Sequence, residues 1–162
     1  MTQQTKPCPK GFHTVTPALT VRDAGKAIDF YKRAFGAEER MRFSGPDGKG
    51  IMHAEITIGD SIIFLGEEHP QMGCIGPQTL GGTPVGLFLY VDDADQVFNR
   101  AVSAGSKSEN PVSDMFWGDR CGTLTDPFGH KWTVATHKED LSMEEIKKRA
   151  QGFFAQMAGQ AR

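Results

Sequence analysis

The chain has 162 residues, of which 38% are hydrophobic and 23% charged, a composition typical of one globular domain of ordinary size. Its formal net charge of −2, without a basic stripe, argues against nucleic-acid binding, and no apolar run approaches the roughly 18 residues that a membrane helix needs. The three cysteines form no Cys-x-x-Cys pair and the polar N-terminus is not a secretory signal, which together favour a reducing cytoplasm.

The first half of the chain predicts a strand, a helix and three further strands. Residues 14–21 read as a strand, and Asp23 then precedes apolar residues at helical spacing that end at Gly36. A hairpin follows across the turn GPDGKG, and the stretch GDSIIFLGEE adds a fourth strand. Residues 66–84 are rich in Gly and Pro and lack periodicity, so we expect a linker or long loop.

The plan restarts at Val85. A strand, an Asp93 that precedes a helix, and three strands follow, around residues 109–113 and at RCGTLTD and HKWTVAT. A shift of seventy residues superposes Asp23 on Asp93 and Gly59 on Gly129. The sequence therefore predicts an α+β chain built from two βαβββ units.

These patterns divide the chain into three parts. Residues 1–12 are expected to be a loose leader, and residues 13–140 a single domain with units at about 13–66 and 84–137. Residues 141–162 are a C-terminal amphipathic helix and tail, which begins with a capping box at Ser142 and carries an apolar stripe. That stripe needs another surface, either its own sheet edge or a second subunit.

Alternation along the strands predicts which sheet face each side chain occupies. Strongly apolar residues are expected under the helices: Leu19, Val21, Ile56, Ile58, Ile62, Phe64, Leu89, Val91, Trp132 and Val134. The opposite parity is small, polar and aromatic: Thr16, Ala18, Thr20, His53, Glu55, Thr57, Ile63, Leu65, Gly86, Phe88, Tyr90, Thr123, Thr125, Thr133 and Ala135. Such a face suits the wall of a small-molecule cavity better than a dry core.

The two βαβββ units resemble the vicinal oxygen chelate superfamily, in its PhnB-like glyoxalase/bleomycin-resistance branch. The segments that carry this resemblance include AIDFYKRAFGA, GPDGKGIMHAEITIGDS and FWGDRCGTLTDPFGHKWTVATHKED. The resemblance spans about residues 12–150. It implies a half-closed, eight-stranded, barrel-like sheet and a tendency to form homodimers. The chemistry stays open, because this superfamily supports many reactions on one scaffold.

The resemblance also implies where metal-dependent members place their ligands, on the first and last strand of each unit. Those positions are Thr16 and Ile63 in the first unit and Gly86 and Thr133 in the second. None offers the imidazole, carboxylate or thiolate that zinc, iron or manganese prefers. We therefore expect no metal and no other cofactor, with a divalent metal as the alternative.

Seven residues are the further candidates for a site. His53, two residues from Glu55, is either a hydrogen-bonding or general-base residue of the cavity or a histidine satisfied by a neighbouring strand. The aromatic and guanidinium groups of one turn can stack on a flat ligand and pair with an acidic group, or form a rim or dimer contact. These residues are Phe116, Trp117 and Arg120, and Phe88 and Tyr90 line the same predicted face.

Three hypotheses for function follow. The first is a metal-free protein that binds a small, partly aromatic molecule, such as a drug or metabolite. The second is a metal-dependent lyase, isomerase or dioxygenase that works through His53 and Glu55. The third is a dimeric protein whose cavity is filled by its own side chains.

Overall fold

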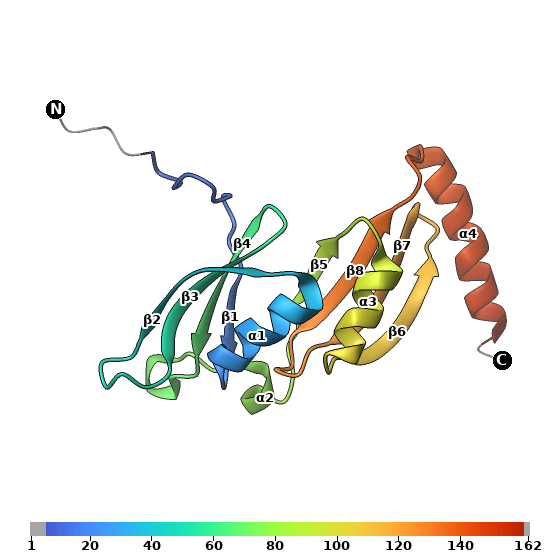
Figure 1. Ribbon diagram of the computed structural model, residues 1–162. Helices are drawn as coiled ribbons and strands as arrows, with labels where there is room; N and C mark the ends of the chain where they lie inside the picture. The colour runs from blue at the N-terminus through green and yellow to red at the C-terminus, as the bar shows by residue number, and fades with distance from the viewer. Residues whose placement is uncertain (1–5, 161–162) are drawn as a thin grey trace. The chain divides into compact units, whose positions relative to one another are not determined.

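The computed structural model describes residues 6–160, so the expected leader lies partly outside the described residues. The chain divides into two compact units between Pro84 and Val85. The first unit contains β1 (Ala18–Val21), α1 (Ala24–Phe35), β2 (Glu38–Ser44), β3 (Ile51–Ile58), β4 (Ser61–Glu67) and two short helical turns, η1 (Pro70–Met72) and α2 (Pro77–Leu80) (Figure 1). The turns lie in the segment predicted to be a linker.

The second unit repeats this order and adds a terminal helix. It contains β5 (Gly86–Tyr90), α3 (Ala94–Ser103), β6 (Lys107–Asp114), β7 (Asp119–Thr125), β8 (Lys131–His137) and α4 (Met143–Gln160). Each unit forms its own four-stranded mixed sheet, in the orders β1-β4-β3-β2 and β5-β8-β7-β6. The α+β class and the two βαβββ units are confirmed, and the described strands pair as two sheets that do not close into one.

The two helices begin in the same way, as the repeat predicts. Asp23 accepts a hydrogen bond from the backbone N–H of Lys26 at 2.9 Å, and Asp93 accepts one from Gln96 at 2.9 Å. Each carboxylate thereby satisfies an N–H of the first turn that has no partner within the helix. The offset of seventy residues is confirmed for this part of each unit.

The offset changes along each unit, because the segments that connect matching strands differ in length between the two units. β3 and β4 are joined by two residues, Gly59 and Asp60, whereas residues 126–130 join β7 and β8. Ala18 pairs with Phe64 in the first sheet, and Phe88 pairs with Thr133 in the second. The offset is therefore 70 on the first strands and 69 on the last, and the expectation of one shift throughout was wrong.

This change of register reverses the predicted faces of β4. Ile63 pairs with Ile56 and Leu65 with Ala54, and all four side chains are buried beneath α1. Phe64 pairs with Glu55 and lies on the opposite face. The prediction that Phe64 lies under the helix and Ile63 faces the cavity is thus corrected, since a shift of one residue inverts every side chain of a strand.

In each sheet we call the surface opposite the covering helix the helix-distal face. In the first unit it carries Ala18, Thr20, His53, Glu55 and Phe64, and in the second Phe88, Tyr90, Asp119, Thr123 and Thr133. Trp132 and Val134 are buried on the other side of the second sheet, under α3, as predicted.

The buried turn Asp126–His130 anchors β8. One oxygen of Asp126 accepts hydrogen bonds from the backbone N–H groups of Phe128 and His130, at 2.9 and 3.0 Å. Its other oxygen accepts a bond from the indole N–H of Trp132 at 2.9 Å. The aspartate therefore ties the backbone of the turn to the largest side chain beneath α3.

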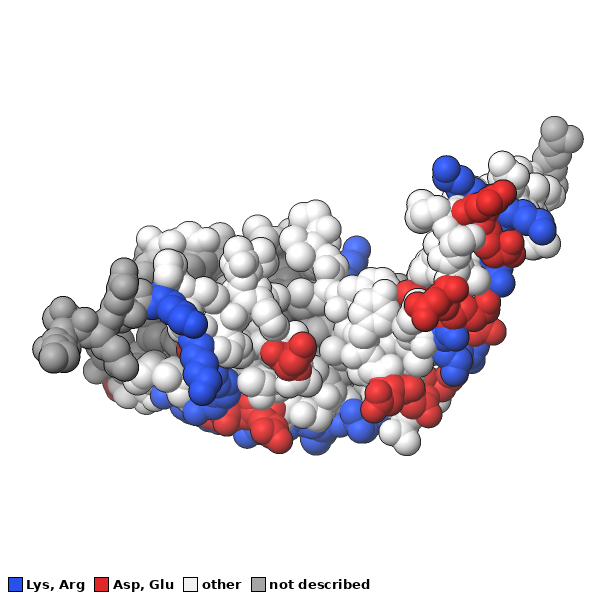
Figure 2. All heavy atoms as spheres, turned by 90° about the horizontal axis from the view of Figure 1, so that it is seen from above, with Lys and Arg blue, Asp and Glu red and all other residues white. Residues whose placement is uncertain are grey.

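Helix α4 starts at the predicted cap, where Ser142 accepts a hydrogen bond from the backbone N–H of Glu145 at 3.2 Å. Ile146 and Ala150 of its apolar stripe are half-buried, whereas Met143, Phe153 and Met157 are exposed. Both signs of charge are interspersed along its length (Figure 2). Among the described residues, no helix combines the length and apolarity needed to cross a membrane.

Candidate functional site

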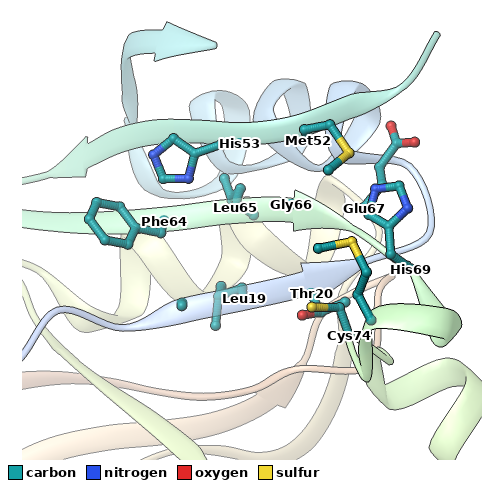
Figure 3. A pocket seen from close by; sticks show the side chains of 12 residues that line it. Leu19, Thr20, Met52, His53, Phe64, Leu65, Gly66, Glu67, His69 and Cys74 are labelled. Atoms are coloured by element: carbon teal, nitrogen blue, oxygen red, sulfur yellow. The ribbon is translucent and has the colours of Figure 1, made fainter. Parts of the chain in front are cut away.

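A hollow of about 210 Å³ lies on the first sheet, along β1, β3 and β4. Figure 3 shows His53 and Phe64 at one end of this hollow, with Glu67, His69 and Cys74 at the other. Ala18, Thr20 and Gly66 of the strands also line it, and Met52 and Met72 add thioether side chains. The lining is mostly apolar with a few polar groups, the composition expected of a site for a small organic molecule.

His53 lies on the predicted face and contacts both an aromatic ring and a carboxylate. Its ring meets Phe64 edge-on, with centroids 4.9 Å apart, and its Nε2 lies 3.7 Å from an oxygen of Glu55. Arg40 donates a hydrogen bond to the other oxygen of Glu55 at 3.0 Å and stands over the ring of Phe12. Arg40 is therefore hydrogen-bonded to one oxygen of Glu55, and the side chain of His53 remains 38% exposed.

The helix-distal face of the second sheet is organised by Asp119, which is 4% exposed. One of its oxygens accepts hydrogen bonds from the Tyr90 hydroxyl at 2.9 Å and from the Trp117 indole N–H at 3.0 Å. Its other oxygen lies 2.7 Å from Nδ1 of His137, whose Nε2 lies 3.0 Å from Asp140. One buried carboxylate thus holds three ring side chains from β5, β8 and the β6–β7 turn; we call these four residues the Asp119 cluster.

The electrostatics of the cluster favour a charged pair. Burial alone would raise the pKa of Asp119, but the hydrogen bonds from His137, Tyr90 and Trp117 outweigh it and lower this pKa. The hydrogen bonds to Asp119 and Asp140 raise the pKa of His137. The hydrogen bond to Asp119 likewise raises the pKa of Tyr90, which keeps its hydroxyl protonated as a donor.

The predicted group of Phe116, Trp117 and Arg120 is divided by the structure. Trp117 joins the Asp119 cluster, whereas the ring of Phe116 makes tilted and edge-on contacts with Phe153 and Phe154 of α4, with centroids 5.5 and 5.9 Å apart. Arg120 alternates with Asp119 and lies on the helix side of the sheet.

There the guanidinium of Arg120 forms a double hydrogen bond to Asp95 of α3, at 2.6 and 2.8 Å, and a further one to Asp114. These partners raise the pKa of Arg120 above its ordinary value. The proposal that Arg120 contacts a ligand beside Trp117 is therefore corrected: its charge is neutralised within the protein and faces away from that surface.

The positions at which the resemblance implies metal ligands are poor ligand sets in the structure as well. Thr133 lies on the helix-distal face and is half-buried, as is Thr16 just before β1. Ile63 is buried under α1, and its place on the helix-distal face is taken by Phe64. Alkyl and phenyl groups cannot bind a divalent metal, and a threonine hydroxyl is not the imidazole, carboxylate or thiolate that zinc, iron or manganese prefers. Within residues 6–160, no three His, Cys, Asp or Glu side chains gather as a metal-binding group.

Sequence reasoning missed Asp119 and His137 as a pair. The signal was available, because counting back from the Asp126 turn places Asp119 opposite His137 on the neighbouring strand. The cluster also draws on Tyr90, which is close only through the parallel pairing of β5 and β8. Cys121, which lies between Asp119 and Thr123 on β7, is 3% exposed, and its burial raises the pKa of its thiol.

Two βαβββ units, each with one helix on a four-stranded sheet and an aromatic helix-distal face, define a class of paired-module α+β proteins. The family model of the Glyoxalase/Bleomycin resistance protein/Dioxygenase superfamily matches residues 11–134. The chain belongs to this superfamily.

Several relatives share most of the chain's length. An uncharacterized protein of Mycobacterium bovis is 44% identical over 137 residues, which cover 82% of this chain and 89% of the relative. The crystal structure of TioX from Micromonospora sp. ML1 is 28% identical, with a TM-score of 0.61, and covers 77% of this chain and 98% of TioX. A PhnB protein of Bacillus cereus, 16% identical with a TM-score of 0.60, shares the fold over 76% of this chain and 99% of its own.

Proposed function

We propose that this protein binds a small, partly aromatic molecule without a metal ion, and that the helix-distal face of the second sheet supplies aromatic contacts. The observation that carries the proposal is the exposure of aromatic rings on a sheet face: Phe88 is 51% and Tyr90 60% exposed. Exposed aromatic groups on one face are characteristic of binding surfaces rather than of inert ones. In the first unit, His53 and Phe64 border the hollow and would contribute a polar and a stacking contact.

Binding of the neutral fluorescent probe N-phenyl-1-naphthylamine tests the proposal. We expect saturable binding at low stoichiometry, and weakening by roughly 1–3 kcal/mol, or five- to a hundredfold, in Phe88→Ala and Trp117→Ala. Phe154→Ala is the matched control, because this ring is 59% exposed on α4 and lies outside both faces. Equal weakening in all three variants, or no saturation, would contradict the proposal.

His53 is expected to provide a hydrogen bond to the bound molecule, so His53→Ala should weaken binding of probes that carry an acceptor more than binding of the plain hydrocarbon-like probe.

Elemental analysis after purification without chelators tests the metal-free part of the proposal. Near-stoichiometric zinc, nickel, manganese or iron would instead support a metal-dependent lyase, isomerase or dioxygenase acting through His53 and Glu55.

We further propose that the protein is a cytoplasmic homodimer. Its three cysteines are free, which suits a reducing compartment, and Phe153, Phe154 and Met157 leave an apolar surface on α4 exposed. Sedimentation velocity tests the dimer. A monomer at all concentrations, or a dimer unaffected by Phe154→Glu, would contradict a role for α4 in association.

A further inference from the structure

The two nitrogens of His137 both face carboxylates. Nδ1 lies 2.7 Å from Asp119 and Nε2 lies 3.0 Å from Asp140. A neutral imidazole has one N–H and one acceptor nitrogen, whereas ionised carboxylates only accept. Both hydrogen bonds can therefore form together only when the ring is protonated.

The charge of this ring reaches the proposed binding surface through Asp119. The oxygen of Asp119 that does not face His137 accepts the hydrogen bonds of Tyr90 and Trp117. In the protonated state, the imidazolium balances the negative charge of a carboxylate that is 4% exposed. Loss of that proton leaves the buried charge with neutral donors alone, which hold it less strongly.

The other groups around His137 act in the same direction. Asp92, in the turn after β5, lines a hollow of about 400 Å³ together with Tyr90, Thr136 and His137. Asp140 approaches from the segment before α4, and Cys121 stands beside Asp119 on β7. None of these groups is cationic, so the surroundings favour the charged ring.

We propose that Asp119 and His137 are positioning residues whose protonation state sets the placement of Tyr90 and Trp117 on the binding surface. This inference rests on the proposed function. At low pH the imidazolium fixes Asp119, which in turn fixes the phenol and the indole. As the pH rises through the pKa of His137, the bond to Asp140 is lost and the two rings become less well held. Ligand affinity would then fall as the pH rises.

Fluorescence of Trp117 tests this coupling without any ligand. The chain has two tryptophans, so Trp132→Phe leaves Trp117 as the single reporter. We expect its emission to titrate with a midpoint above the ordinary histidine value of 6.5, and the titration to disappear in a second variant, His137→Gln. His69→Gln, at the hollow of the other unit, is the control and should leave the titration intact.

A second measurement uses the chain with both tryptophans, in case Trp132→Phe does not fold. The His137 ring proton, assigned by its loss in His137→Gln, should titrate at a lower pH in Asp140→Asn than in the unaltered chain. A flat Trp117 emission in a folded variant, a titration that survives His137→Gln, or an unchanged His137 midpoint in Asp140→Asn would overturn the inference. Failure of probe binding alone would contradict the proposed function and leave the titration as a separate result.

Discussion

Replacement of Trp132 should reveal how much the Asp126 turn contributes to the stability of the second unit. The side chain is 3% exposed, and its indole N–H donates to Asp126 at 2.9 Å. Trp132→Ala removes a large buried ring, which typically costs about 3–5 kcal/mol in free energy of unfolding. Trp132→Phe keeps most of the apolar contact but removes the donor to a buried carboxylate, so we expect a smaller loss of about 1–3 kcal/mol.

Urea denaturation followed by far-UV circular dichroism measures both variants, because that signal does not depend on tryptophan. Phe43→Ala, an exposed aromatic truncation on β2, should cost less than about 1 kcal/mol. The reasoning would be refuted if Trp132→Ala proved no more destabilising than Phe43→Ala. It would also be refuted if Trp132→Phe matched Trp132→Ala, because the ring would then contribute nothing beyond its hydrogen bond.

Three further outcomes are expected. Gly118 has a φ of 100°, and a Cβ there would lie 2.5 Å from the carbonyl oxygen of Glu139. Gly118→Ala should therefore lower the melting temperature by several degrees. Gly86→Ala is the control and should not lower it, because a Cβ at that position would have open space around it. Hydrogen bonds from Arg42 and then Lys32 lower the pKa of Glu39 to about 2. The contribution of Glu39 to the free energy of unfolding is therefore present above the ordinary pKa of 4.5 and is lost as the pH falls toward 2. Acid titration of Glu39→Gln should show a shallower loss of stability over that window. EDTA should leave the melting temperature unchanged, and a drop of several degrees would show that a bound metal supports the fold.

The parts of the fold that depend on local sequence were predicted well. Asp23 and Asp93 are N-caps because a carboxylate just before an apolar helical pattern can accept a hydrogen bond from a free N–H of the first turn. The hydroxyl of Ser142 accepts such a bond at the start of α4. The faces of β4 were predicted wrongly because they depend on the length of a turn. Gly59 and Gly129 match as letters, but one lies in a two-residue turn and the other in a five-residue turn.

The candidate site was predicted only in part, for a related reason. Phe88, Tyr90 and His53 follow from strand parity, which is local. The Asp119 cluster depends on which strands are neighbours: Tyr90 and Asp119 are 29 residues apart, and Asp119 and His137 are 18 apart. Arg120 was misplaced because its partner Asp95 belongs to the covering helix, and no short-range pattern reports that contact.

The change of offset between the first and the last strands has a consequence for engineering this scaffold. In a chain with two repeated units, the matching position in the second unit is usually found by adding a constant to the residue number. Here the constant is 70 on the first strands but 69 on the last, so Thr133 has its counterpart at Phe64, not at Ile63. A carboxylate grafted at position 64 would join the helix-distal face beside Glu55. The same substitution at position 63 would bury an unpaired charge beneath α1 and unfold the first unit.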